Sequence, residues 1–391
     1  MTAPPCPSHS LERTALADLV ERFASTEIAP HVNAWDEAGE FPRGLYQRAA
    51  ELGLLGIGYP QSLGGSDEDC SLTPMTVKLG MWIALARSGT SGGVFASLFS
   101  HNIGMPPVLA YGSDAIKSEV LPAVLRGEKI SALCITEPGG GSDVGALRTS
   151  AVLDGDHYIV QGEKTFITSG LRADWLTVAV RTDAQRGAAG ISMLLIPSAS
   201  AGITRNKLDK MGWWCSDTAH IRFDAVRVPA RYLLGGEGAG FKIIMGNFNG
   251  ERLAMAAGAL GFAQACYDEA LAWAQQRKTF SKALAEHQVI RHKLVDMQMR
   301  IRSTQAWTNA VAAQHDSSDT GTDWVANVCL LKNHATQTMQ FCADQAVQIL
   351  GGMGYMRGTV SERIYREVKI MMIGGGAEEI MKELAAKQMG I

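Results

Sequence analysis

The 391-residue chain changes its hydrophobic period twice along its length, and this order constrains the fold more than any other feature. Apolar residues recur at helical spacing up to about residue 127, alternate in short runs up to about residue 235, and recur at helical spacing again after Gly240. A helical period buries one stripe of a helix, and an alternating period buries one face of a strand. The sequence therefore predicts an α+β chain, mostly α, with a helical domain over 1–127, a β domain over 128–235 and a helical domain over 236–391.

Three helices are expected in the first domain because proline and serine are common at helix starts. They begin at Pro42, Pro74 and Ser113. The first is expected to end near Gly53 and the third near Leu125.

Short apolar or alternating runs predict the strands of the middle domain. These runs are Ile130–Thr136, Tyr158–Gln161, Trp175–Arg181, Ile191–Pro197 and His220–Val228. Turn pairs such as Asp154-Gly155 and Ala201-Gly202 separate them, which is typical of antiparallel pairing. In the last run, Ile221, Phe223 and Ala225 are expected on the buried face.

The last domain is expected to be a set of long helices. Residues 260–271 and 290–301 each carry an apolar stripe at helical spacing, and the polar stretch 316–323 is expected to separate two helices.

Composition excludes several classes of protein. With 36 Lys and Arg against 39 Asp and Glu, the net charge of −3 argues against a general nucleic-acid binder. No apolar run approaches the roughly 18–20 residues that span a bilayer. The first twenty residues contain only one arginine and no signal-peptide core, so a cytoplasmic protein is expected. The seven scattered cysteines form no CxxC pair, which indicates reduced thiols and no metal site.

A glycine-rich segment carries the clearest chemical signal. Residues 133–143 read Leu-Cys-Ile-Thr-Glu-Pro-Gly-Gly-Gly-Ser-Asp. Three successive glycines let backbone N–H groups approach a ligand closely, as a diphosphate requires. A glycine triplet alone could equally be a hairpin, but this longer string resembles the flavin-binding signature of the acyl-CoA dehydrogenase family.

The resemblance extends over nearly the whole chain. Further matching segments follow in order, at 164–170, 210–218, 277–280, 287–288 and 348–352. It implies a helical N-terminal domain, a central antiparallel β-barrel-like domain and a C-terminal four-helix bundle. It also implies FAD as the cofactor.

By the same resemblance, one set of residues is expected around the flavin ring and diphosphate, and its member Ser142 is also expected beside CoA. This set is Leu133, Ile135, Thr136, Gly141, Ser142, Phe166 and Thr168. A second set is expected to bind the adenosine half of FAD on a neighbouring subunit: Arg277, Phe280, Gln288, Gln348, Gly351 and Gly352. The second set implies at least a dimer, and a homotetramer built as a dimer of dimers. From the residues alone, 166–168 could be an ordinary strand and Arg277 a solvated cation at a helix end.

The resemblance implies dehydrogenation of an acyl-CoA thioester, and this reaction needs a base because the α-proton of the thioester is only weakly acidic. A carboxylate suits this role if burial raises its pKa. The commonest family position for the base is occupied here by Gly375, while Glu378 and Glu379 follow in the first turn expected for the last helix, where they suit the helix dipole. A subset that includes isovaleryl-CoA and long-chain dehydrogenases has a motif resembling Asn-Gly-Glu-Arg-Leu at 249–253, so Glu251 is the predicted base. The alternative is a surface glutamate paired with a cation.

Several neighbours of these positions are expected to bind substrate or cofactor. The resemblance assigns the backbone N–H of Gly375 to the thioester oxygen, with Gly376 beside it, and such donors matter where charge develops. It places Asn249 and Arg252 near CoA or the active site. The remaining positions are Ala377 and Glu379, expected near FAD, and Trp213 and Trp214, expected at either an active-site entrance or a subunit surface.

The function implied is α,β-dehydrogenation of an acyl-CoA, with electrons passed to an electron-transfer flavoprotein. One alternative is a flavoenzyme of the same fold that acts as an oxidase or on a non-CoA substrate, although such oxidases usually carry an added C-terminal domain. Another is a non-catalytic binding or assembly protein, which would not need the Glu251 carboxylate. The length and branching of the acyl chain do not follow from the sequence.

Overall fold

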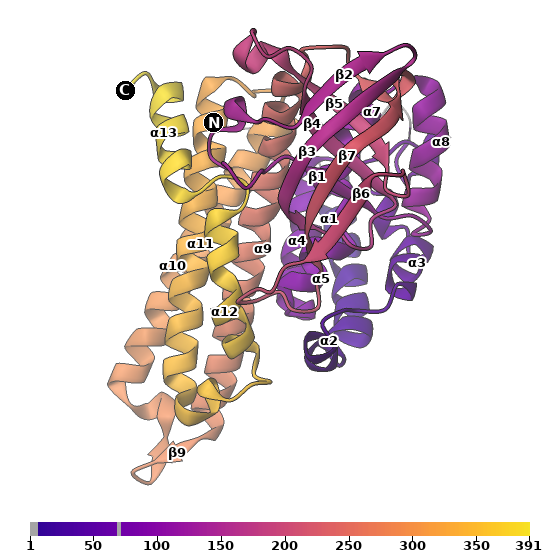
Figure 1. The fold of residues 1–391 in the computed structure, drawn as a ribbon. Coiled ribbons are helices and arrows are strands. Elements are labelled where there is room, and N and C mark those ends of the chain that lie inside the picture. Colours follow the sequence, from indigo (N-terminus) through magenta and orange to yellow (C-terminus); the bar gives the residue numbers. More distant parts are fainter. Residues whose placement is uncertain (1–6, 69–71) are drawn as a thin grey trace.

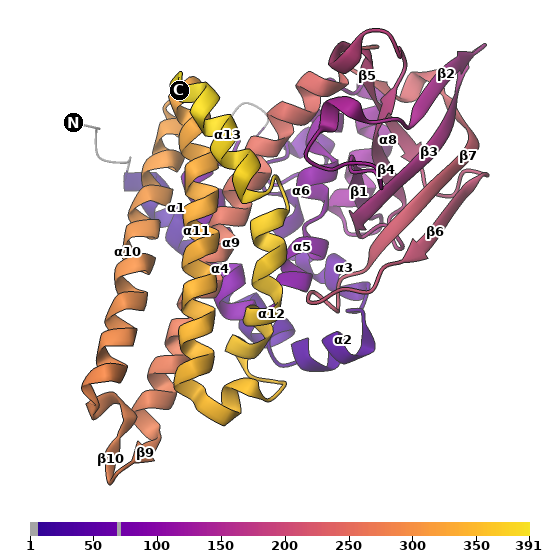
Figure 2. The same cartoon turned by 60° about the vertical axis from the view of Figure 1, so that its left-hand side comes forward.

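The computed structural model describes residues 7–68 and 72–391. Figures 1 and 2 show a helical bundle on one side, a sheet on the other, and the N-terminal helices packed against both. The N-terminal α4 contacts α9 of the bundle, and α6 contacts strand β1 of the sheet. The α–β–α order expected from the hydrophobic periods is confirmed.

The N-terminal helices follow the expected start signals. They are α1 (Pro7–Phe23), α2 (Val32–Ala38), α3 (Gly44–Glu51), α4 (Met75–Gly89), α5 (Gly92–Leu98), α6 (His101–Gly104), α7 (Pro106–Tyr111) and α8 (Asp114–Leu125), with a π-helical stretch at Ala24–Ile28. The Ser113 hydroxyl accepts the Ile116 N–H at 3.4 Å, as an N-cap should. The three helices predicted here correspond to α3, α4 and α8.

The middle third forms one sheet. Its strands are β1 (Ser131–Cys134), β2 (Ser150–Asp154), β3 (His157–Thr168), β4 (Trp175–Arg181), β5 (Ile191–Pro197), β6 (Ile203–Lys207), β7 (Thr218–Pro229) and β8 (Leu233–Leu234). The order is β6-β7-β3-β2-β4-β5-β8, with β1 also paired to β4. The long neighbouring strands β4 and β5 pair antiparallel, and so do β3 and β7, as expected. β1, the strand that follows the N-terminal helices, pairs with β4 in parallel.

The predicted buried face of 220–228 is wrong at one position. Ile221 and Phe223 are fully buried, but Ala225 is exposed. Ala225 has a φ of +50°, and the register between β3 and β7 shifts at this point. The bulge moves the alternation by one residue, so that Val226 and Val228 are buried instead.

The C-terminal third is a bundle of long helices. They are α9 (Gly240–Gln276), α10 (Gln288–Asp316), α11 (Thr322–Leu350), α12 (Val360–Ile373) and α13 (Glu378–Met389), with the hairpin β9 (Lys278–Thr279) and β10 (Lys282–Ala283) between α9 and α10. The expected polar break lies between α10 and α11. The hairpin is at the end of the bundle farthest from α13 (Figure 1). Within the described residues, no helix is both long and apolar enough to cross a membrane.

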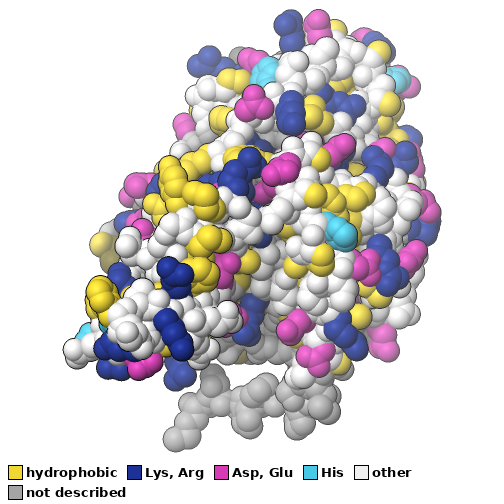
Figure 3. Space-filling model, turned by 90° about the horizontal axis from the view of Figure 1, so that it is seen from below, with side chains coloured by type: hydrophobic (Ala, Val, Ile, Leu, Met, Phe, Trp, Pro, Cys, Tyr) yellow, Lys and Arg dark blue, Asp and Glu magenta, His cyan; other side chains and the backbone are white. Residues whose placement is uncertain are grey.

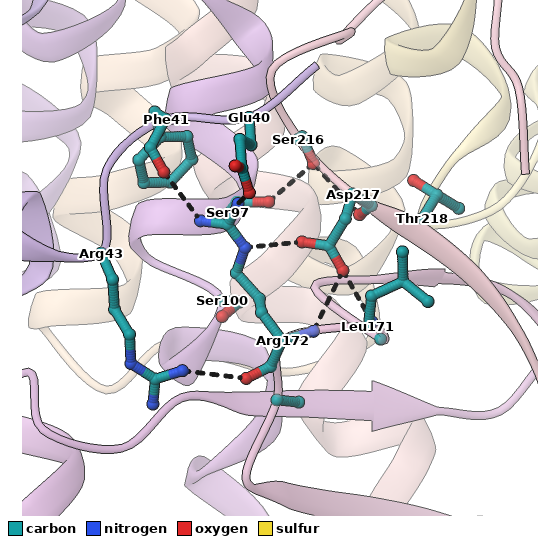
Figure 4. A network of polar contacts seen from close by, with 12 residues as sticks. Glu40, Phe41, Arg43, Ser97, Ser100, Leu171, Arg172, Ser216, Asp217 and Thr218 are labelled. Carbon is teal, nitrogen blue, oxygen red and sulfur yellow. Dashed lines mark hydrogen bonds and ion pairs between the residues drawn. The ribbon is translucent and has the colours of Figure 1, made fainter. Parts of the chain in front are cut away.

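Arg172 and Asp217 join the sheet to the N-terminal helices (Figure 4). The Arg172 Nε lies 2.9 Å from Asp217 Oδ1, and its guanidinium donates to the Phe41 carbonyl at 3.2 Å. The hydroxyls of Ser97 and Ser216 are 2.6 Å apart. Because Phe41 and Ser97 belong to the first third and the others to the middle third, these contacts hold the sheet in place on the helices.

The described cysteines are free and buried, as expected for small core side chains. They are Cys134, Cys215, Cys266, Cys329 and Cys342. Cys6 and Cys70 lie outside the described residues.

Candidate active site

Glu251 of α9 and the loop between α12 and α13 lie side by side, although 124 residues of chain separate Glu251 from Gly375. A Cβ placed on Gly375 would lie 3.9 Å from the Glu251 carboxyl oxygen Oε1 and 3.0 Å from Met255 Sδ. Gly375 has a φ of +65°, a conformation that glycine adopts without strain. The two positions that sequence reasoning singled out for catalysis therefore meet in the fold.

Buried cations hold the loop by its carbonyl groups. Arg252, which is almost fully buried, donates through Nε to the Gly375 carbonyl at 2.9 Å. Lys332 of α11 is fully buried and donates to the carbonyls of Met372 and Gly376, each at 2.8 Å. In the part of the chain that the structure describes, no acceptor pairs with the N–H of Gly375. That N–H is free to bind an oxygen atom of a ligand.

The Glu251 carboxyl has the electrostatics of a general base. Glu251 as a residue is partly exposed, but its Oε2 is buried and has no hydrogen-bond partner among the described residues. Burial raises the pKa of Glu251, and the charges of Arg252 and Lys332 oppose the shift. A buried carboxylate with a raised pKa binds a proton more readily than one in water.

Glu378 and Glu379 are not arranged as a catalytic base. Both lie in the first turn of α13, where acidic groups interact favourably with the helix dipole. Glu378 lies 2.7 Å from Lys382 Nζ and accepts from Gln337 at 2.8 Å, and Glu379 is exposed. Ala377 is the N-cap residue, and its methyl side chain cannot accept a hydrogen bond from the helix.

Asn249 lies two residues before Glu251 on α9 and binds Arg252. Its Oδ1 accepts from Arg252 Nη1 at 3.2 Å, and the Arg252 guanidinium lies 5.5 Å from the Phe248 ring centre. In this structure Asn249 therefore orients the side chain that holds the Gly375 carbonyl.

The glycine-rich segment forms an open turn at the end of β1. Its backbone closes between Glu137 and Gly140, with N···O distances of 3.2 and 3.0 Å. A Cβ on Gly139 or Gly140 would meet no atom within 4 Å, and one on Gly141 would approach only Thr136. Residues 139–142 are exposed; the Gly140 N–H is bound to the Glu137 carbonyl, and the N–H groups of the other three have no acceptor among the described residues and are accessible to a ligand. The turn fits the diphosphate of FAD.

Phe166 is presented to solvent by a bulge in β3. Its φ is +60°, which is rare for an aromatic residue, and its side chain is 69% exposed. The register between β3 and β7 shifts between Lys164 and Ile167, so the bulge directs the ring away from the sheet. Strain of this kind is concentrated at functional sites, and an exposed ring beside the glycine-rich turn fits a stacking partner for the isoalloxazine.

The rest of the first flavin set lies around β1 and β3. Leu133 is on β1, Ile135 and Thr136 follow it directly, and Thr168 ends β3. The Thr165 N–H donates to the Thr136 carbonyl at 2.9 Å. The structure therefore brings the segments 133–142 and 166–168 together.

The second flavin set lies at the other end of the molecule. Arg277, Phe280, Gln288, Gln348, Gly351 and Gly352 are all exposed around the β9–β10 hairpin and the adjoining end of α11. Figures 1 and 2 both show this hairpin at the end of the bundle, away from β1 and β3. One copy of the chain does not bring the two sets together.

The end of the bundle is apolar as well as exposed. Phe280 is 92% exposed at a φ of +52°, and Tyr355 is 82% exposed. Figure 3, which views the molecule from this end, shows hydrophobic and basic side chains interspersed on the surface. Such a surface is typical of a contact with another protein or a ligand.

Trp213 packs against Gly92 of α5, and Trp214 packs against arginines in and just before α12. Trp213 has a φ of +55°, and its indole lies where a Cβ on Gly92 would be. Trp214 lies beneath the guanidinium groups of Arg357 and Arg366, at 4.5 and 3.8 Å from its ring centre. Trp213 therefore holds the β6–β7 connection on α5, and Trp214 holds it on α12, the helix that leads to the Gly374–Ala377 loop.

Glu367, on the same face of α12, is a fully buried carboxylate. Its Oε2 accepts the Gly92 N–H at 2.9 Å, and Oε1 has no partner among the described residues. Burial, with the negative charge of Asp36, raises the pKa of Glu367 to about 7, and Arg363 and Arg366 oppose the shift.

Replacing Glu367 with glutamine is expected to remove a pH dependence of stability. Because the folded pKa of about 7 lies above the ordinary 4.5, the contribution of this group is full below pH 4.5 and is lost as the pH rises through 7. Between pH 5 and pH 8 the wild type should lose on the order of 2–3 kcal/mol relative to the variant. Unfolding midpoints in urea at both pH values measure this. Glu383→Gln, an exposed carboxylate near Lys387, is the control and should follow the wild type; an unchanged pH dependence in Glu367→Gln would refute the assignment.

Sequence reasoning did not find two buried lysines that organise the site. Lys332 holds the loop carbonyls, and Lys164 binds Glu137 below the glycine-rich turn. Lysine is rarely buried without a partner, so sequence patterns place it outside. The only available signal was the position of Lys332 on the apolar face of its helix.

Comparison with known proteins identifies one family along nearly the whole chain. Models of the acyl-CoA dehydrogenase N-terminal, middle and C-terminal domains match residues 10–128, 132–226 and 238–390. A Bacillus subtilis protein named a probable acyl-CoA dehydrogenase, YngJ, is 35% identical over 97% of this chain and 98% of its own length.

Solved structures give the same result. A probable acyl-CoA dehydrogenase from Mycobacterium abscessus is 44% identical, with a TM-score of 0.93 over 99% of this chain and 100% of that one. A glutaryl-CoA dehydrogenase from Mycobacterium smegmatis, in complex with FADH2, is 25% identical, with a TM-score of 0.89 over 97% of this chain and 94% of that one.

Proposed function

The chain belongs to the acyl-CoA dehydrogenase family, and from this membership we propose that it converts an acyl-CoA thioester to the trans-2-enoyl-CoA with Glu251 as the base. The observation that carries the proposal is that the Glu251 carboxyl lies beside Gly375: its Oε1 is 3.9 Å from a Cβ built there, its buried Oε2 has no partner among the described residues, and the Gly375 N–H has no acceptor among them. One group accepts a proton and the other binds an oxygen that gains negative charge. These are the two requirements for removing a proton from the α-carbon of a thioester.

The roles of the residues follow from their contacts. The Glu251 carboxylate takes the α-proton, and the Gly375 N–H binds the thioester oxygen as it becomes enolate-like. Arg252 holds the Gly375 carbonyl at 2.9 Å, which fixes the backbone of Gly375 and so the position of its oxygen-binding N–H. Gly376, whose carbonyl binds Lys332, lies beside the substrate, and Asn249 orients Arg252.

The cofactor of this family is FAD. When bound, it supplies the acceptor for the hydride that leaves Cβ. We assign Gly141 and Ser142 to its diphosphate and Phe166 and Thr168 to its ring, beside Leu133, Ile135 and Thr136; the exposure of the turn and of the Phe166 ring supports this assignment. Ala377 and Glu379 lie at the start of α13 and are assigned to the same cofactor.

A complete cofactor site requires a second copy of the chain. The exposed set at the end of the bundle binds the adenosine half of FAD in the partner subunit, so the smallest functional unit is a dimer, and two dimers form the tetramer. The distance between the two sets within one chain supports this assignment (Figure 2).

Mixing two inactive variants is expected to restore activity. Glu251→Gln lacks the base but keeps the end of the bundle, and Phe280→Asp keeps the base but places a carboxylate where FAD should bind. In a mixed dimer, one of the two sites has both an intact base and an intact partner surface. Refolding the variants together should give up to about one quarter of wild-type turnover, because half of the dimers are mixed and each has one intact site. Mixtures no more active than either parent would refute shared sites.

Stopped-flow mixing with a panel of acyl-CoA thioesters, first under anaerobic conditions and then in air-saturated buffer, tests the function. Bleaching of the flavin absorbance without oxygen consumption, followed by reoxidation with an electron-transfer flavoprotein, is the expected result. Bleaching with rapid oxygen consumption would indicate an oxidase. No bleaching by any thioester would refute the proposal, and the chain length that bleaches fastest identifies the substrate class.

A further inference from the structure

Lys164 of β3 is a fully buried cation that no catalytic step uses. Its Nζ donates to the Ile135 carbonyl at 3.0 Å and to Glu137 Oε1 at 2.8 Å. The Glu137 carboxylate also accepts the N–H groups of Arg148 and Thr149, at 2.6 and 2.9 Å. Both charged groups are therefore hydrogen-bonded, the carboxylate through both oxygens and the ammonium through two of its three N–H donors.

This ion pair lies between the two flavin segments. Ile135 and Glu137 belong to the chain that leaves β1 and forms the glycine-rich turn, and Lys164 is two residues before the bulged Phe166. The neighbouring bond from Thr165 N–H to the Thr136 carbonyl joins the same two segments at 2.9 Å. The pair thus fixes the turn relative to the bulge.

A buried ion pair is a poor means of stabilising a fold. Transferring two charges out of water has a free-energy cost that offsets much of their mutual attraction. Well-packed apolar side chains of similar size often stabilise a fold as well or better. A pair held by several hydrogen bonds does, however, define one geometry where apolar packing would permit several. The pair is therefore better explained by the precision it gives to its surroundings.

We propose that Lys164, paired with Glu137, is a positioning residue for FAD. Its ammonium holds the Ile135 carbonyl and the Glu137 carboxylate so that the diphosphate-binding turn and the Phe166 ring have the spacing that the cofactor needs. The inference rests on the proposed function only in taking FAD as the ligand.

Two variants separate positioning from stability. Lys164→Met removes the cation but leaves Glu137 buried without its partner, so it is expected to lower the melting temperature. Lys164→Met with Glu137→Gln leaves no buried charge and should recover most of that loss. Arg227→Met, which breaks the exposed pair with Asp154 in the same sheet, is the control.

The measurements are the FAD dissociation constant, from flavin fluorescence, and the visible circular dichroism of the bound flavin. Both Lys164 variants should bind FAD at least tenfold more weakly than the wild type and show altered flavin dichroism, and the control should match the wild type. A double variant with wild-type affinity and dichroism would overturn the proposal, because the pair would then be only structural. If wild-type protein binds FAD but no acyl-CoA bleaches it, the proposed function fails and this result still stands.

Discussion

Replacing Glu251 with glutamine is expected to give a folded, yellow, FAD-bound protein that dehydrogenates acyl-CoA at least about 10³-fold more slowly. Glutamine has nearly the same shape as glutamate but cannot accept the α-proton. Because the Glu251 carboxyl is buried and its Oε2 has no partner, the neutral amide should not destabilise the fold. Flavin bleaching under single-turnover conditions measures the effect without interference from product release.

The pH dependence of the wild type gives a second measure of the same group. Burial raises the pKa of Glu251, and only the carboxylate form can take a proton. The rate of bleaching should therefore rise with pH, with a midpoint above the ordinary carboxyl pKa of 4.5. This dependence should be absent from the residual activity of Glu251→Gln.

Glu378→Gln is the matched control. Glu378 lies in the same region but is bound to Lys382 and Gln337, so its loss should change the rate less than about tenfold. Near-wild-type bleaching in Glu251→Gln, or a larger loss in Glu378→Gln, would show that the base is elsewhere.

Local patterns predicted the elements of the fold but not their partners. The bounds of β4 and β5 follow from apolar runs flanked by turns, and the start of α8 follows from Ser113 as the N-cap. The strands β2 and β6 were not predicted, because much of each is exposed: β6 is mostly polar, and the apolar Val152 and Leu153 of β2 do not alternate with polar residues. The parallel pairing of β1 with β4 depends on segments about 40 residues apart, which no local pattern records.

In the candidate site, too, the residues could be predicted but their tertiary contacts could not. The assignment of Glu251 came from a resemblance of its motif to a subset of the family, and nothing in the spacing of the chain placed it beside Gly375. The burial of Lys164 and Lys332 could not be predicted, because a lysine is buried only where the tertiary structure supplies carbonyl or carboxylate partners. The exposed Phe166 reads as an ordinary strand residue until the bulge and its φ of +60° are known.

Replacing Arg252 with methionine is expected to lower the rate of dehydrogenation about 100-fold while FAD stays bound. The change removes the hydrogen bond to the Gly375 carbonyl and leaves that buried group without a partner. The N–H that binds the thioester oxygen then loses its fixed position, and a lost oxygen-binding donor costs about 10²–10³ in rate. Lys332 still holds the carbonyls of Met372 and Gly376, so the loop should not unfold.

The same variant should also change the pH profile, because the Arg252 charge lowers the pKa of Glu251. Without that charge, the carboxyl is protonated up to a higher pH, and the midpoint of the bleaching rate should move upward. Arg252→Lys keeps the charge but not the geometry of the guanidinium, so it should lower the rate and leave the midpoint near that of the wild type. If Arg252→Met keeps both the wild-type rate and the wild-type midpoint, Arg252 neither positions Gly375 nor influences Glu251, and the loop must be held in its active position by Lys332 alone.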